Sequence, residues 1–268
     1  MSQPTTLMYP DEYRVMFEIE DDYWWYRGLR ELIKNLLARY APARSSHPRI
    51  LDVGCGTGAN LKLLQSYGDA IGVDISDQAI GFCRVRGISQ NRMFLASAID
   101  LPFPDSQFDL AVSFEVLCNL DEDELALHEI ARVLKPGAHF IVGLPAYQWL
   151  WSMHDVAVGH KRRYDSQEVR RKLSAAGFEI ERVTYANAML LPLIAAVRLL
   201  SREKQKVHSD LVPLPRFINT FLTALFVAEM RTVSRVNLPF GVTLIAVARK
   251  RGLPSSAEEG WRTEGRAR

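Results

Sequence analysis

Hydrophobic residues along this chain occur either in short continuous runs or in stripes that repeat every three or four positions. The short runs predict buried strands of a parallel sheet, and the stripes predict amphipathic helices that pack on it. Because the two patterns alternate, the chain is predicted to adopt an α/β fold. Strands are expected at 50–53, 70–74, 110–114, 139–144, 178–185 and 242–248, with a short strand and loop over 93–103.

The last predicted strand returns late in the chain. About fifty residues separate it from the strand before it, and they carry two mostly apolar helical patterns, at 186–200 and 217–230. Neither pattern is long enough to span a bilayer. They fit a helical cap or a dimer face. Alternatively they form a surface that meets a membrane or a lipid-linked acceptor, with four cations at the level of the headgroups: Arg198, Arg202, Lys204 and Arg216.

Two further helical patterns lie in residues 9–40 and meet at an aromatic segment, Tyr-Trp-Trp-Tyr, at 23–26. The second of these helices is expected over 28–40, with its leucines on one face. The aromatic segment either anchors both helices on the core or closes over a ligand pocket. We assign residues 1–47 to an N-terminal helical lid.

The strongest chemical signal is a glycine-rich turn between the first predicted strand and the helix after it. Asp52 is followed by Gly54, Gly56 and Gly58, and glycine lets bare backbone approach a ligand closely. A strand, a glycine turn and a helix at the carboxyl edge of a sheet form a nucleotide-type site. With Ala59 in the last position, the spacing also fits the loose dinucleotide pattern, so a nicotinamide cofactor is one alternative.

Composition limits the class of protein. The chain has 268 residues, 48% of them hydrophobic, which is enough for one large α/β domain with elaborations. A formal net charge of +2 gives no strong nucleic-acid footprint. Cys55, Cys83 and Cys118 are isolated, which suits a reducing cytosol. The N-terminal residues show no pattern of a secretory signal, so we expect a cytoplasmic protein, or one at the inner face of the membrane.

Several motifs in the same order resemble those of the class I S-adenosylmethionine-dependent methyltransferases, in particular the methyltransferase type 11 group. They are the glycine turn, Leu101-Pro102-Phe103, and the Leu-Lys-Pro-Gly turn at 134–137. The resemblance covers roughly 48–185 and a last strand near 241–249. It implies a Rossmann-like fold: a seven-stranded, mostly parallel sheet with an antiparallel last strand.

The domain organisation follows from this resemblance and from the helical patterns. The methyltransferase domain is expected over 48–252, with a helical insertion at 186–238 before the last strand. Residues 253–268 are polar and are predicted to form a disordered tail.

The resemblance also implies a cofactor site. Asp74, 22 residues after Asp52, is placed to accept both ribose hydroxyls, although capping the next helix is its other interpretation. Ser97 replaces the aspartate with which the family accepts from the adenine amino group. In the pocket-closing interpretation of the aromatic segment, Arg27 or Arg30 reaches the methionine carboxylate. The residues expected to contact S-adenosylmethionine are Asp52, Gly54, Cys55, Gly56, Gly58, Asp74, Ile75, Ser97, Ala98, Ile99 and Phe114.

Residues 145–164 follow the fifth predicted strand at the same edge of the sheet and are unusually rich in polar and aromatic side chains. His154 or His160 is a candidate general base for an acceptor hydroxyl or amine. Tyr164 is a third catalytic candidate. The alternative is a loop whose polar groups satisfy one another and brace the fold. The residues expected to bind the acceptor are Trp25, Tyr26, Trp151, Asp155, Arg162 and Arg163. No metal site is predicted, because His154, Asp155 and His160 lack an evident further ligand.

The resemblance implies transfer of a methyl group from S-adenosylmethionine to a hydroxyl, amine or carbon of a small-molecule, sugar or lipid-linked acceptor. Two alternatives stay open: an NAD-dependent oxidoreductase on the same glycine turn, and a non-catalytic S-adenosylmethionine-binding protein. We expect no nucleic-acid partner. A homodimer, and contact with a membrane through 186–236, are further expectations.

Overall fold

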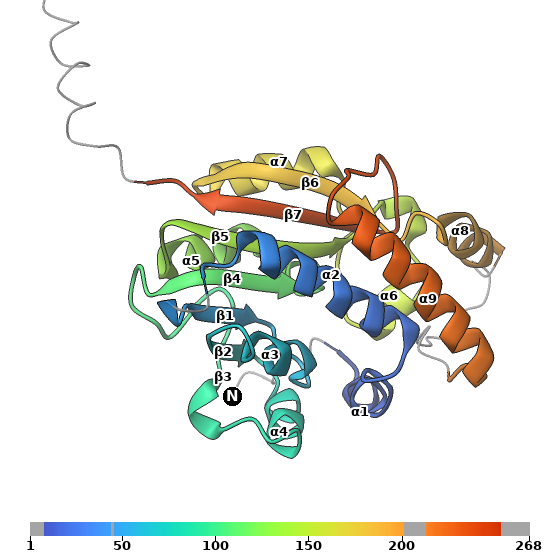
Figure 1. Cartoon of the computed structure of the whole chain (residues 1–268), viewed down its shortest axis with the longest axis horizontal. Coiled ribbons are helices and arrows are strands. Elements are labelled where there is room, and N and C mark those ends of the chain that lie inside the picture. Colours follow the sequence, from blue (N-terminus) through green and yellow to red (C-terminus); the bar gives the residue numbers. More distant parts are fainter. Residues whose placement is uncertain (1–7, 44–45, 201–212, 253–268) are drawn as a thin grey trace, which may run out of the picture.

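A computed structural model describes residues 8–43, 46–200 and 213–252. Its centre is one sheet of seven strands in the order β3-β2-β1-β4-β5-β7-β6 (Figure 1). The strands are β1 (Arg49–Val53), β2 (Asp69–Asp74), β3 (Met93–Leu95), β4 (Phe108–Phe114), β5 (Leu134–Pro145), β6 (Phe178–Ala186) and β7 (Thr243–Lys250).

The last strand runs against its neighbours. The pairs β1–β2, β1–β4, β2–β3 and β4–β5 are parallel, whereas β7 pairs antiparallel with both β5 and β6. Since the order reverses between β1 and β4, the carboxyl ends of these strands form the crevice in which α/β proteins bind ligands. The predicted fold class is confirmed.

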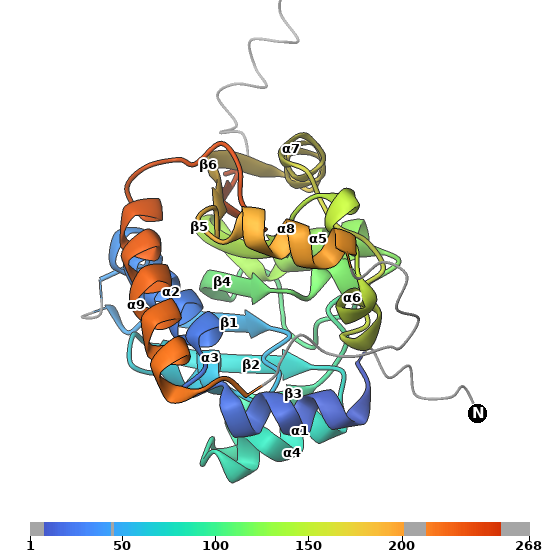
Figure 2. The ribbon, with the colours of Figure 1, turned by 90° about the vertical axis from the view of Figure 1, so that its right-hand side faces the viewer.

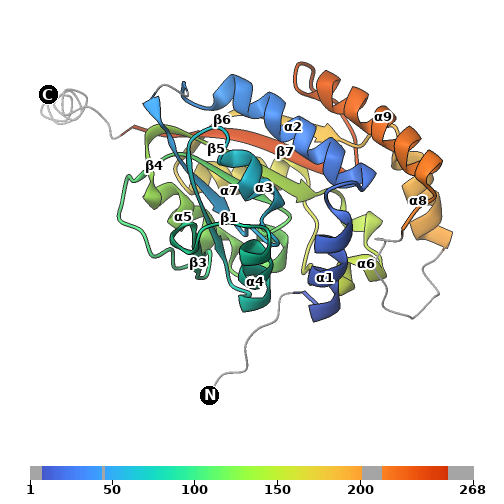
Figure 3. The same ribbon diagram turned by 60° about the horizontal axis from the view of Figure 1, so that its bottom comes forward.

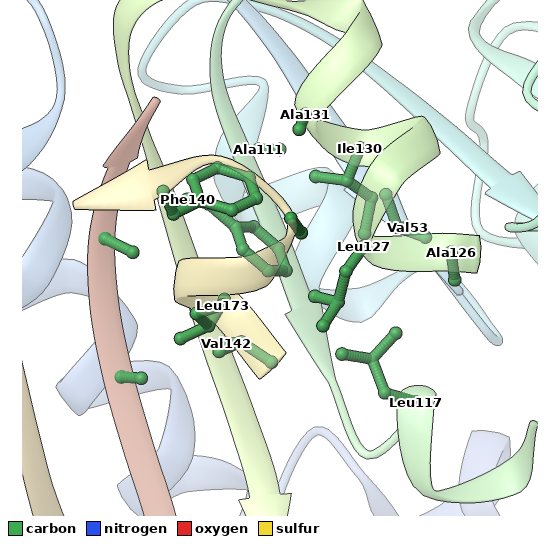
Figure 4. Packing of buried hydrophobic residues seen from close by; sticks show 14 of the residues in the cluster. Val53, Ala111, Leu117, Ala126, Leu127, Ile130, Ala131, Phe140, Val142 and Leu173 are labelled. Carbon is green, nitrogen blue, oxygen red and sulfur yellow. The ribbon is translucent and has the colours of Figure 1, made fainter. Parts of the chain in front are cut away.

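Helices cover both faces of the sheet. They are α1 (Pro10–Ile19), α2 (Trp24–Tyr40), α3 (Ala59–Leu64), α4 (Asp77–Val85), α5 (Asp123–Val133), α6 (Met153–Ala157), α7 (Ser166–Ala175), α8 (Leu191–Leu200) and α9 (Arg216–Val233). One core joins the sheet to α5 and α7, where Leu127, Phe140 and Leu173 pack together (Figure 4). The other core joins the opposite face to α2, α3, α4 and α9.

Two boundaries differ from the sequence-based prediction. Helix α2 begins at Trp24 instead of residue 28, so the aromatic segment forms its first turn. The side chain of Asn219 on α9 accepts from the Trp24 amide and satisfies this helix end. Strand β5 begins at Leu134, so the predicted Leu-Lys-Pro-Gly turn is already part of the strand. Residues 253–268, the predicted disordered tail, lie outside the described residues.

Four helices surround the carboxyl edge of the sheet. Figure 2 faces this edge and shows α1, α6, α8 and α9 around the ends of β1, β2 and β4. Figure 3 shows α1 between α4 and α6. The buried carboxylate of Glu229 on α9 accepts from the amides of Ala188 and Met189, at 2.7 and 3.1 Å, and so fixes the residues that lead into α8. In the part of the chain that the structure describes, no helix combines the length and apolarity needed to cross a membrane.

The contact between α2 and α9 depends on Gly28. A Cβ at this position would lie 2.0 Å from the Phe226 ring, which also stacks on Trp25 at a centroid distance of 5.3 Å. We expect Gly28→Ala to lower the free energy of unfolding by about 1–3 kcal/mol, because the helices must separate. Urea unfolding measures this difference.

Gly81→Ala is the matched control. Gly81 also lies in a helix, but an added Cβ would meet none of the described residues' heavy atoms within 4 Å. This substitution should raise stability by about 0.5–1 kcal/mol, because alanine favours the helix. Equal effects of the two substitutions would contradict close packing at Gly28.

Candidate active site

The glycine turn after β1 lies directly against the end of β4. Gly54 has a φ of +76°, and a Cβ there would lie 2.1 Å from the side chain of Val116. The amides of Gly54 and Cys55 both donate to the carbonyl of Val73 on β2, at 2.8 and 2.9 Å. Glycine is therefore needed at this position for its conformation and for the close approach of β4.

Asp74 at the end of β2 holds the same turn. One carboxylate oxygen accepts from the Gly56 amide and the other from the Ser76 amide, both at 2.9 Å. Helix α4 is capped by Ser76, whose side chain accepts from the Ala79 amide, and not by Asp74. Each carboxylate oxygen has a second lone pair, so Asp74 retains the capacity to bind two hydroxyl groups.

Asp52 is an isolated buried carboxyl group within β1. It is 2% exposed, and its Oδ2 atom has no hydrogen-bond partner among the described residues. Burial, with a smaller contribution from the charge of Asp74, raises the pKa of Asp52 from 3.8 to about 7.

Helix α1 is fixed over the glycine turn by buried charges. The Thr57 hydroxyl donates to the carboxylate of Glu20, which also pairs with Arg86 on α4. Arg86 donates to the Thr57 carbonyl at 3.1 Å and lies over the Phe17 ring. Helix α1 and the turn are thereby joined through Glu20, Thr57 and Arg86, none of which was among the predicted site residues.

A cavity of about 530 Å³ extends from this turn along the carboxyl edge toward α8. Eight of the predicted cofactor residues line it: Gly54, Cys55, Gly56, Asp74, Ile75, Ser97, Ala98 and Phe114. Asp52, Gly58 and Ile99 lie outside the lining. Of the predicted acceptor and catalytic residues, Trp25, Tyr26, His154, His160 and Arg163 line the cavity.

The loop after β5 is organised around Asp155, which is fully buried. His160 Nδ1 lies 2.8 Å from Asp155 Oδ1, and Arg163 Nη2 lies 2.7 Å from the same oxygen. Arg198 of α8 lies 3.7 Å from Asp155 Oδ2. Together these cationic and hydrogen-bonding partners hold the pKa of Asp155 well below its usual range despite burial.

Glu115 lies beside His160 in the lining of the cavity, and the sequence-based analysis did not select it. Its Oε2 atom lies 3.5 Å from His160 Nε2, and burial raises its pKa. Its φ of +58° is unusual for a residue with a side chain, and its amide donates to the Gly143 carbonyl at 2.9 Å. The position directly after a strand end, at the ligand edge, was the available signal.

Four of the predicted acceptor and catalytic residues do not line the cavity. The Tyr164 hydroxyl donates to the carboxylate of Asp123 at 2.7 Å, and Arg162 lies 3.6 Å from the same carboxylate. Asp155 and Trp151 are not part of the lining, although the cationic partners of Asp155 are. Because Tyr164 and Arg162 both contact Asp123, their placement favours the interpretation that they brace the fold.

Arg27 and Arg30, expected to reach the methionine carboxylate of the cofactor, lie outside the cavity lining. Arg30 donates to the carbonyls of Glu20 and Asp21, at 2.6 and 2.9 Å.

Among the described residues, one group of three has metal-ligand spacing: Glu115, Cys118 and His160, with ligand atoms within 4.8 Å of one another. It differs from the histidine and aspartate set considered from the sequence. Burial raises the pKa of the Cys118 thiol well above its usual range, so the thiolate that a metal needs is disfavoured.

The strand order, the antiparallel β7 and the glycine turn define the class I methyltransferase fold. A sequence model of the methyltransferase domain family matches residues 51–142. This match and the fold confirm the predicted resemblance to the class I S-adenosylmethionine-dependent methyltransferases and the cofactor that it implies.

Related proteins agree on the family and differ in their reactions. A Mycolicibacterium smegmatis protein, named as a probable S-adenosylmethionine-dependent methyltransferase, is 28% identical over 66% of this chain and 68% of its own length. An O-methyltransferase of Penicillium expansum is 36% identical over 41% of this chain. A fatty-acid O-methyltransferase of M. smegmatis is 37% identical over 35% of this chain. The chain spans only 42% and 35% of the lengths of these last two proteins.

Solved structures resemble this fold at low sequence identity. An S-adenosylmethionine-dependent methyltransferase from Mesorhizobium loti has a TM-score of 0.54 and 18% identity, over 86% of this chain and all of its own. A (4+2)-cyclase has the same TM-score and 24% identity, over 83% of this chain and 81% of its own. The likeness establishes the fold, and the cyclase illustrates that a fold does not determine the reaction.

The raised pKa of Asp52 predicts a pH-dependent stability. Between about pH 4 and pH 7 the folded state binds more protons than the unfolded state, so stability should fall as pH rises. Asp52 can account for a loss of about 4 kcal/mol at most in the free energy of unfolding over this pH range. We expect Asp52→Asn to reduce the loss seen between pH 5.5 and pH 8 in urea unfolding of the ligand-free protein. An unchanged pH dependence in the variant would show that Asp52 is ionised throughout.

Proposed function

We propose that this protein transfers a methyl group from S-adenosylmethionine to a hydroxyl oxygen of a small-molecule acceptor. The observation that carries the proposal is His160, which lines the cavity with one ring nitrogen bonded to the buried Asp155. A histidine oriented by a carboxylate, with its second nitrogen toward the cavity, is suited to accept a proton from a hydroxyl.

The residues at the glycine turn fit the cofactor. Gly54 and Gly56 leave backbone without Cβ atoms beside the cavity, Asp74 suits the ribose, and Ser97 and Ala98 suit the adenine. A cationic ligand above the turn would favour the ionised form of Asp52, whose pKa burial raises in the ligand-free protein. S-adenosylmethionine supplies a methyl group on a sulfonium, whose sulfur becomes a neutral thioether after transfer.

The residues of the chain then align the acceptor and remove its proton. Asp155 and Arg163 hold the ring of His160, and the acceptor proton moves from oxygen to Nε2. Such alignment is the main requirement of an in-line displacement, and a base adds about 10²–10⁴-fold. The names of the Penicillium and M. smegmatis relatives support an oxygen acceptor. A relative named as a sterol C-methyltransferase from Arabidopsis thaliana keeps transfer to carbon as the second candidate.

His160→Ala tests this assignment. Turnover should fall by about 10²–10⁴-fold, because the proton acceptor is removed, while the affinity for S-adenosylhomocysteine should stay within about twofold. Formation of S-adenosylhomocysteine from S-adenosylmethionine, with a panel of phenols, alcohols and amines, measures turnover. Calorimetry measures the affinity.

His154→Ala is the matched control. His154 lines the same cavity, with its ring centroid 6.5 Å from that of His160. We expect a smaller loss of turnover in this variant. A larger loss in His154→Ala would assign the base to His154, and a matching loss of cofactor affinity in His160→Ala would make His160 structural.

The partner surface is a separate proposal. Phe217 and Phe221, one helical turn apart near the start of α9, are 75% and 68% exposed. We propose that they contact a membrane surface, and a homodimer through the same face is the second candidate.

The double variant Phe217→Ser/Phe221→Ser should bind anionic phospholipid vesicles several-fold more weakly than wild type, because apolar area at the interface is lost. Cosedimentation measures the bound fraction. Val85→Ser, at an exposed position on α4, is the control. Unchanged vesicle binding, together with a dimer in light scattering that the double variant abolishes, would assign the face to self-association.

A further inference from the structure

The apolar wall of the cavity continues onto the outside of the protein. Leu193 and Val197 of α8 line the cavity and yet are 61% and 54% exposed. They lie four residues apart, so they form one stripe along the helix, and Met189 extends it at 57% exposure. The cavity therefore opens along an apolar track, and the contact of these side chains with water is unfavourable.

The inner end of this track is polar and has no excess positive charge. Both arginines of the lining, Arg163 and Arg198, lie beside the buried carboxylate of Asp155. Arg163 also donates to the Ala146 carbonyl and Arg198 to the Leu150 carbonyl, at 3.0 and 2.9 Å. Both arginines therefore have partners within the protein, although both line the cavity. Glu115, in contrast, presents its carboxyl group to the cavity.

This arrangement discriminates by charge. Above the raised pKa of Glu115, where its carboxylate is ionised, an anionic group beside it would meet a second negative charge in a partly buried site, where repulsion is poorly screened. A neutral hydroxyl can donate to Glu115 or to His160 and loses little on leaving water. A phosphate or a carboxylate would have to compete with Asp155 for both arginines, because Arg163 donates to Asp155 and Arg198 lies 3.7 Å from it.

We propose that the acceptor is an uncharged amphipathic molecule whose hydroxyl group binds beside Glu115 and His160, within hydrogen-bond distance of both, and whose apolar tail leaves the cavity over Leu193 and Val197. This proposal rests on the proposed function and specifies its substrate class. Glu115 selects against anionic head groups, and the exposed stripe of α8 is covered by the tail of the acceptor. The assignment differs from the carboxylate acceptor that the name of the M. smegmatis fatty-acid relative implies.

Three probes, two of which share a heptyl tail, test the preference for an uncharged head group and the binding of the tail. The probes are 4-heptylphenol, 4-heptylbenzoate and phenol, titrated by calorimetry into the full chain saturated with S-adenosylhomocysteine. We expect 4-heptylphenol to bind at least about tenfold more tightly than phenol, because its tail buries apolar surface. It should also bind at least about tenfold more tightly than 4-heptylbenzoate, because of the charge of Glu115.

Two variants locate the effects. Leu193→Ser/Val197→Ser should weaken 4-heptylphenol about tenfold and leave phenol within twofold. Glu115→Gln should remove most of the preference for 4-heptylphenol over 4-heptylbenzoate, since amide and carboxyl groups have similar shapes. The matched control, Val85→Ser/Leu125→Ser, changes exposed apolar residues of α4 and α5 and should bind all probes as wild type does.

Several results would overturn the proposal. They are tighter or equal binding of 4-heptylbenzoate, equal binding of phenol and 4-heptylphenol, or equal losses in the α8 and control variants. Weaker vesicle binding of the α8 variant with unchanged 4-heptylphenol affinity would assign the stripe to a membrane instead. Failure of wild type to bind S-adenosylhomocysteine would refute the proposed function itself, and the two failures are therefore distinct.

Discussion

The proposed acceptor end of the cavity depends on one buried carboxylate, Asp155. It orients His160, neutralises Arg163 and attracts Arg198 from α8, so the loop after β5 and the helical insertion are joined through one side chain. A carboxylate at this depth is stable only because its partners are cationic or donate hydrogen bonds. The same pairing leaves Glu115 as a carboxyl group that faces the ligand, which sets the charge of the cavity.

The cofactor end depends on a steric constraint. Because Gly54 has no side chain, Val116 packs on the turn and the end of β4 lies beside the end of β1. The chain after Phe114 then turns through an unusual conformation at Glu115, which directs this residue into the cavity. This contact brings together the two halves of the proposed site, a nucleoside half over β1 and β2 and an acceptor half over β4 and β5.

Patterns local in the sequence predicted the fold well and the site in part. Apolar runs, the glycine turn and Asp74 are determined by neighbouring residues, so the sheet and most of the cofactor lining could be expected. Tyr164 and Asp123 lie far apart in the chain, and nothing in the spacing showed that they bond. Arg198 interrupts an apolar helix, which was a visible signal, but its approach to Asp155 exists only in the folded chain.

The proposed function requires that the glycine turn and Asp74 bind an adenosyl thio-compound. Calorimetric titration of wild type, Asp74→Ala and the nearby exposed control Asp77→Ala with S-adenosylmethionine, S-adenosylhomocysteine and NAD tests it most directly. The account predicts binding of the two adenosyl thio-compounds that Asp74→Ala weakens at least about tenfold and Asp77→Ala leaves unchanged, because the ribose loses its acceptor. Binding of NAD alone, or of no compound, would contradict it.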